Sequence, residues 1–257
     1  MSLPHNKNEK SIWCKYKPAL LKLLCLYVKN RSELSNDNNS FMIEEIISFA
    51  YRSEEDDCIL SETAKSLYDH IITDDDYYRK SCCYAFAHSI AKINPSLLLS
   101  VFLPDDTELG YKVAHVLYNR IAERCCLQDC NTNAVLDWAY QKPMERLEKI
   151  ARIVNIVEYI DDGIRITELA QSIIDSEYIS ERTLDALMNS FDWGLWTSRL
   201  SAALKKRLTL IEQLQFHKNE IVRQWTTKIV GEINNKISFW EQQELAEQNR
   251  VPTSFEP

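Results

Sequence analysis

The residues of this chain whose types and spacing could do chemistry are its cysteines and its short acidic runs. The tightest cysteine group is Cys125 and Cys126, with Cys130 four residues further on. A structural zinc site normally combines two Cys-x-x-Cys-like halves, and this sequence supplies no second half. The acidic runs at 74–76 and 161–162 could offer oxygen ligands, but neither has the spacing of a calcium-binding loop. We therefore predict no metal centre and no cofactor.

Nucleophilic catalysis would require a thiolate or hydroxyl beside a base in one pocket. The histidines are scattered over predicted helices, and no catalytic signature surrounds any cysteine. The four glycines, at 110, 163, 194 and 231, are too widely spaced to form a phosphate-binding loop. These features favour a non-enzymatic protein. A helical metal-dependent enzyme that uses the acidic clusters stays open as an alternative.

The elements that position these residues follow first from composition. The chain has 4 glycines and 7 prolines in 257 residues, whereas average usage would give roughly 18 and roughly 13. Hairpin-rich β folds need glycine in their turns, and doubly wound nucleotide-binding folds need it where the backbone meets phosphate. The sequence therefore predicts an all-α fold, with helices joined by polar turns and without strands.

Helix boundaries follow from capping residues and from apolar residues that recur every three to four positions. Asn94 and Pro95 supply an N-cap and a first helical residue, and Asn219 caps a last helix that reaches about Gln248. Asp162-Gly163 predicts the end of a helix that starts at Pro143. The other helices are predicted near 11–30 or 17–30, 40–51, 61–72, 74–94, 104–126, 133–141, 166–175, 181–190 and 197–215.

Two segments share the same order of residue types. Each begins with an Asp or Asn that can cap a helix, continues with an apolar residue followed by arginine, and then has two small residues and further apolar ones. One begins at Asn219 and has Arg223, and the other begins at Asp75 and has Arg79. This layout resembles the second helix of a HEAT repeat. The resemblance implies an α-solenoid of stacked antiparallel helix pairs, in which Asp75, Arg79, Asn219 and Arg223 are structural. An irregular helical bundle is the alternative architecture.

The charge of the chain points to the kind of partner. The formal net charge is −8, yet residues 1–30 carry six lysines against one glutamate, so the middle of the chain is strongly acidic. An acidic surface repels phosphate, which makes nucleic acid an unfavourable partner and favours a protein. Acids and tryptophans are the residues expected to bind that partner: Glu54, Glu55, Asp56, Asp57, Asp74, Asp76, Trp193 and Trp196.

The sequence thus predicts a non-enzymatic helical scaffold that binds a protein through an acidic groove. By analogy it suits a bacterial immunity or defence component, or a part of a larger protein. A HEAT-like nucleic-acid-binding or repair protein is the alternative, for which only residues 199–250 could supply a basic surface. We expect one elongated domain over 1–257, with a possible division near 127–132 or 191–197. Reduced cysteines and the lack of a secretory leader or membrane span predict a cytoplasmic location.

Overall fold

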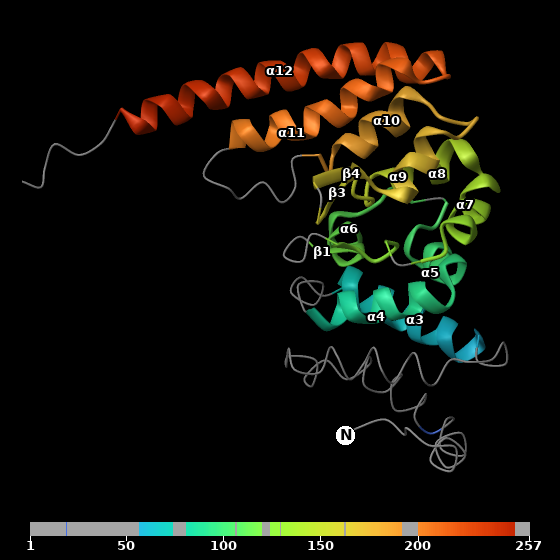
Figure 1. Ribbon diagram of the computed structural model, residues 1–257. Helices are drawn as coiled ribbons and strands as arrows, with labels where there is room; N and C mark the ends of the chain where they lie inside the picture. Colours follow the sequence, from blue (N-terminus) through green and yellow to red (C-terminus); the bar gives the residue numbers. More distant parts are fainter. Residues whose placement is uncertain are drawn as a thin grey trace, which may run out of the picture. The chain divides into compact units, whose positions relative to one another are not determined.

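The structure is a computed structural model that describes residues 19, 57–73, 81–105, 107–119, 124–128, 130–161, 163–191 and 200–249. Within these residues the chain is mostly helical (Figure 1), so the predicted all-α class is confirmed. The chain divides into two compact units between Lys149 and Ile150. This boundary lies at neither of the two loops named from the sequence. No helix in the described part of the chain is both long and apolar enough to cross a bilayer.

The first unit contains short helices and one small hairpin. Asn94 Oδ1 accepts a hydrogen bond from Leu97 N–H at 2.9 Å and Pro95 follows it, so α5 begins as predicted. Asn131 caps α7 in the same way. The elements are α3 (Asp57–Thr73), α4 (Ser81–Ile93), α5 (Pro95–Phe102), α6 (Tyr111–Leu117), β1 (Tyr118–Asn119), β2 (Arg124–Cys125), α7 (Thr132–Tyr140) and α8 (Pro143–Ala151).

Apolar faces hold these short helices together. Leu60, Ala64, Leu67 and Ile71 recur every three or four residues along α3, so they share one face, and all four are fully buried. Both α3 and α4 pack against α5 and α6. Each buried large aliphatic side chain contributes roughly 1.5–3 kcal/mol. Helices of this length are marginal in water by themselves, so packing supplies most of their stability.

The second unit contains a hairpin followed by two helix pairs. Thr167, Ser180 and Asn219 each cap a helix with a side-chain oxygen, as expected for these residue types. The last two helices lie side by side and run antiparallel (Figure 1). The elements are β3 (Val157–Ile160), β4 (Gly163–Ile166), α9 (Glu168–Ile174), α10 (Glu181–Met188), α11 (Leu200–Gln213), a 3₁₀ turn (Leu214–Phe216) and α12 (Glu220–Gln248).

The segment 157–166 is a β-hairpin, and the predicted helix that starts at Pro143 is wrong beyond Ala151. β3 pairs antiparallel with β4, and Ile160 lies opposite Gly163. Gly163 has φ +143°, a conformation that side-chain-bearing residues rarely adopt. Glycine is therefore needed here as expected, but it closes a two-residue hairpin turn and does not end a helix.

The predicted helix over 104–126 is likewise too long. α6 covers only Tyr111–Leu117, and the chain then pairs Tyr118 with Cys125 in the small β1–β2 hairpin. The prediction of no strands fails in both places for the same reason. A short strand gains its hydrogen bonds from a partner segment, so a local apolar period does not distinguish it from the end of a helix.

Candidate interaction surface

The helix pair α11–α12 is built on a stripe of apolar residues. Val222, Ile229, Ile233 and Ile237 follow each other along α12 at helical spacing and are buried. α11 supplies buried partners from its own face, Leu204, Leu208 and Ile211. Since the stripe occupies one side of α12, its other side points outward along most of the helix.

The turn between these helices holds two of the residues predicted to be structural. Asn219 Oδ1 accepts a hydrogen bond from Ile221 N–H at 2.9 Å, so the predicted start of the last helix is confirmed. Arg223 Nη1 donates to the carbonyl oxygens of His217 at 2.7 Å and Lys218 at 2.8 Å. These contacts of Arg223 close the turn of its own helix pair. Charge-assisted bonds of this kind stabilise a turn by roughly 1.5–3 kcal/mol each.

His217 lies in the same turn with both ring nitrogens engaged. Asn219 N–H donates to Nδ1 at 3.1 Å, so the ring hydrogen is on Nε2, which donates to Asp175 Oδ1 at 2.9 Å. Burial alone would raise the pKa of Asp175, but hydrogen bonds from Gln171 and His217 and the charge of Lys218 lower it below its ordinary value. Neither nitrogen of His217 is left to take a proton from a substrate, so the ring is a structural link.

Acids of α10 join α10 to α12. Glu181 forms an ion pair with Lys228 at 3.1 Å, and Asp185 Oδ1 accepts from the indole N–H of Trp225 at 2.9 Å. The indole bond is the stronger tie, because Trp225 is buried whereas the Glu181–Lys228 pair is exposed and screened by solvent. Both acids are therefore engaged within the chain.

The N-terminus of α11 is capped from α12. Ser201 donates its backbone N–H to Glu244 Oε1 at 2.9 Å and its hydroxyl to Oε2 at 2.7 Å. A carboxylate at this position also meets the positive end of the helix dipole. One turn further along α11, Lys205 pairs with Glu241 at 2.5 Å. These contacts fix the register of the two helices.

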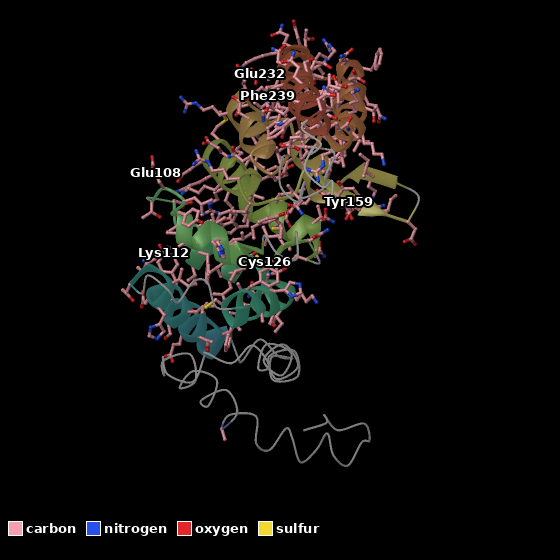
Figure 2. All side chains as sticks on the ribbon, turned by 90° about the vertical axis from the view of Figure 1, so that its left-hand side faces the viewer. Glu108, Lys112, Cys126, Tyr159, Glu232 and Phe239 are labelled. Atoms are coloured by element: carbon pink, nitrogen blue, oxygen red, sulfur yellow. The ribbon has the colours of Figure 1, made fainter. Side chains whose placement is uncertain are left out.

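Two exposed aromatic residues follow each other near the C-terminal end of α12. Phe239 is 53% exposed and Trp240 is 38% exposed, and their rings make an edge-to-face contact with centroids 5.4 Å apart. Phe239, labelled in Figure 2, follows the buried Ile237 by two residues, and this helical spacing places it on the opposite side of the helix. Leu245, 59% exposed, lies less than two turns further on. Trp240 follows Ile237 by three residues and so lies beside the packed stripe, yet it too is exposed. The part of α12 around Phe239 and Trp240 is therefore the candidate surface for a partner.

A polar cluster in the first unit surrounds Arg146. Its guanidinium forks onto Asp105, with Nε 2.8 Å from Oδ1 and Nη2 3.1 Å from Oδ2. Nη1 donates to Trp138 O at 2.7 Å and Gln141 Oε1 at 2.9 Å, and the group stacks 4.3 Å from the centroid of the Trp138 ring. Buried Lys149 donates to the carbonyl oxygen of Asp105 at 2.9 Å. Hydrogen bonds from Arg146 and Lys142 hold the pKa of Asp105 well below its usual range. The cluster has partners within the protein and acts as a structural tie.

Arg207 is a second structural cation, in the second unit. It is 2% exposed and donates to the carbonyl oxygen of Phe191 and, at 3.1 Å, to the hydroxyl of Tyr159. The ring of Tyr159, labelled in Figure 2, has its centroid 5.6 Å from the guanidinium carbon. Arg207 therefore joins α11 to β3 and does not contribute positive charge to the surface.

Several predicted site residues have no described side chain. Asp57 begins α3, but its side chain is not among those described. In the described part of the chain, no group of three or more His, Cys, Asp and Glu side chains could hold a metal ion. The residues that lie outside the described ranges are Glu54, Glu55, Asp56, Asp74, Asp75, Asp76, Arg79, Trp193 and Trp196.

Comparisons with protein-family models, curated proteins and solved structures give no match. Phe239 and the cluster around Arg146 were both missed from the sequence. Phe239 gives a usable signal, because it departs from the apolar stripe of its helix. Arg146 gives none, because its partner Asp105 lies 41 residues earlier in the sequence.

Proposed function

We propose that this chain is a non-enzymatic helical scaffold that binds a protein partner. The observation that carries the proposal is the aromatic pair Phe239–Trp240, both exposed near the C-terminal end of α12. Tryptophan is enriched at protein-binding hot spots, where its truncation typically costs 2 kcal/mol or more. A large side chain that is already ordered by an aromatic neighbour loses little conformational freedom on binding.

A HEAT-like stacking of helix pairs is part of this proposal. It is supported by the α11–α12 pair, whose turn is closed by Asn219 and Arg223 in the layout that resembles a HEAT repeat. The matching layout at Asp75 and Arg79 lies outside the described residues. In such an architecture an end helix pair presents one side outward, and that side is available to a partner.

The acidic runs complete the proposed partner-binding surface. Residues 54–57 and 74–76 carry seven acids in two short segments. A partner with a basic surface would gain from this charge mainly in the rate of encounter and in selectivity. The aromatic pair would supply most of the binding free energy, because exposed charges are screened by salt.

Charge pairing in the last two helices favours a protein over nucleic acid. Lys205 and Lys228 are paired with Glu241 and Glu181, and Arg207 is buried. A phosphate backbone would have to compete with these carboxylates for the lysines. Residues 199–250 are basic in sequence, yet these three cations and Arg223 are engaged within the protein.

The test is a capture experiment with the full chain from a lysate of its source cells, read by mass spectrometry. Wild type is compared with Phe239→Ala/Trp240→Ala and with the control Gln242→Ala/Gln243→Ala, which changes two exposed polar residues of the same turn. We expect one protein at equimolar amount with wild type and control. Removing both aromatic side chains should cost about 2–3 kcal/mol of binding free energy. The aromatic variant should therefore bind this protein more weakly by roughly 30- to 150-fold.

Two results would reject the proposal. The first is a captured partner that binds the aromatic variant as tightly as wild type and also binds a variant neutralised at Glu54, Glu55, Asp56 and Asp57. The second is captured nucleic acid whose affinity falls steeply with salt, as phosphate contacts require. Equal melting temperatures of wild type, control and variant would show that the fold is intact in each comparison.

A further inference from the structure

Three thiols come together in one turn of the first unit. Cys125 ends β2, and the carbonyl oxygen of Cys125 accepts from Gln128 N–H at 3.1 Å. A second turn follows at once, because Cys130 N–H donates to Leu127 O at 3.1 Å. The thiol of Cys130 donates to the carbonyl oxygen of Cys126 at 3.5 Å. The helix predicted to run through Cys126 is absent, so this segment forms tight turns instead.

The three cysteines differ in access to solvent. Cys125 and Cys126 are buried, whereas Cys130 is half-buried (Figure 2 labels Cys126). Burial raises the pKa of the Cys126 thiol well above its ordinary value, and a hydrogen bond with the Cys125 thiol raises it further. Cys126 is therefore a protonated, shielded thiol that does not start a reaction. A dissolved reagent meets Cys130 first.

We propose that Cys130 and Cys126 form an oxidisable thiol pair, in which Cys130 reacts with a low-molecular-weight disulfide and Cys126 then closes an internal disulfide. In the first step Cys130 loses its proton and attacks one sulfur of the reagent disulfide. A mixed disulfide forms and one reagent thiol leaves with the proton. In the second step Cys126 attacks the Cys130 sulfur, and its proton leaves with the second reagent thiol. Two protein thiols are oxidised and one reagent disulfide is reduced to two thiols.

The contacts favour a Cys126–Cys130 bond over the two other pairings of these three thiols. Consecutive Cα atoms lie 3.8 Å apart, which is shorter than the usual disulfide range of 4.4–6.8 Å, so a Cys125–Cys126 bond would be strained. The Cys130 sulfur already lies against Cys126, because its thiol donates to the Cys126 carbonyl oxygen at 3.5 Å. The Cys125 sulfur also accepts from Leu127 N–H at 3.4 Å, which directs it toward the backbone of its own turn.

The experiment treats the folded full-length protein with oxidised glutathione and follows the disulfides by peptide mass mapping over time. We expect a glutathione adduct on Cys130 first and a Cys126–Cys130 disulfide later. Cys130→Ser should abolish both products in this segment. Cys126→Ala should trap the adduct on Cys130, and the matched control Cys125→Ala should still form the internal disulfide.

Three results would overturn the inference. They are a first adduct on Cys125 or Cys126, a final bond from Cys130 to any cysteine other than Cys126, and an adduct on Cys130 that never converts in wild type. If Cys126→Ala does not fold, judged by circular dichroism, the wild-type time course alone decides between these outcomes. The inference does not depend on the scaffold function, because it rests on the chemistry of one turn.

Discussion

Replacing Arg146 with lysine should destabilise the first unit while keeping its charge. The guanidinium makes four hydrogen bonds, two to Asp105 and one each to Trp138 and Gln141. A lysine ammonium is a point charge that cannot fork onto a carboxylate or stack flat on an indole. The variant Arg146→Lys would keep an ion pair with Asp105 but lose the bonds that need the planar group.

The magnitude follows from the contacts that are lost. Hydrogen bonds to charged groups contribute about 1.5–3 kcal/mol each, and a cation stacked on tryptophan contributes about 0.5–2 kcal/mol. Arg146 is 12% exposed and Asp105 is 19% exposed, so solvent replaces part of what is removed. We therefore expect a net loss of about 2–3 kcal/mol. With a urea slope of about 2 kcal/mol/M, the midpoint of the first unit falls by about 1 M or more.

Urea unfolding followed by circular dichroism measures this loss, and hydrogen exchange of peptides from α8 locates it. Arg182→Lys is the matched control, because Arg182 is exposed on α10 and should change stability by less than about 0.5 kcal/mol. Since the chain has two compact units, the transitions are fitted separately where they do not coincide. Equal urea midpoints for Arg146→Lys and Arg182→Lys would show that the planar, two-pronged hydrogen bonding of Arg146 does not stabilise the first unit.

Three further predictions follow from single positions. The pKa of Asp105 is lower in the folded protein than the unfolded value of 3.8, so its ionised form stabilises the fold. This contribution is complete above pH 3.8 and decreases as the pH falls below that value. The urea midpoints at about pH 5 and pH 3 should therefore differ more in wild type than in Asp105→Asn. Glu244→Gln should weaken the cap of α11 and cost about 1 kcal/mol in thermal unfolding, whereas Glu247→Gln, exposed on the same helix, should cost less than about 0.5 kcal/mol. Gly163→Ala should destabilise the protein by about 1–3 kcal/mol, because alanine rarely adopts the positive φ of this position. Gly231→Ala should stabilise the protein by about 0.5–1 kcal/mol, because a methyl group at this position of α12 meets no neighbouring atom. Melting temperatures of the two variants that shift in the same direction would contradict this pair of predictions.

Local signals in the sequence were enough to predict helix starts. Asn94-Pro95 and Asn219 cap the helices that they were expected to cap, because a cap satisfies N–H groups two or three residues away. The need for glycine at 163 was also correct, although its setting was not. A glycine in the sequence indicates that the backbone can adopt a positive φ at that position. It does not indicate whether the turn ends a helix or joins two strands.

Contacts between distant segments could not be predicted in this way. Arg146 meets Asp105 across 41 residues, and Ser201 meets Glu244 across 43. Neither pair has a spacing that marks it in the sequence. Phe239 was missed for a related reason, since its exposure depends on which side of α12 packs against α11.

The sequence by itself determined the all-α class, the capped helix starts and the acidic charge of the middle of the chain. These depend on composition and on interactions within a few residues. Only the tertiary structure decided that 157–166 forms a hairpin, that Arg207 is buried and that Phe239 is exposed. Strand pairing and burial are properties of two segments that meet in space, and their free energy appears only after the chain has brought them together.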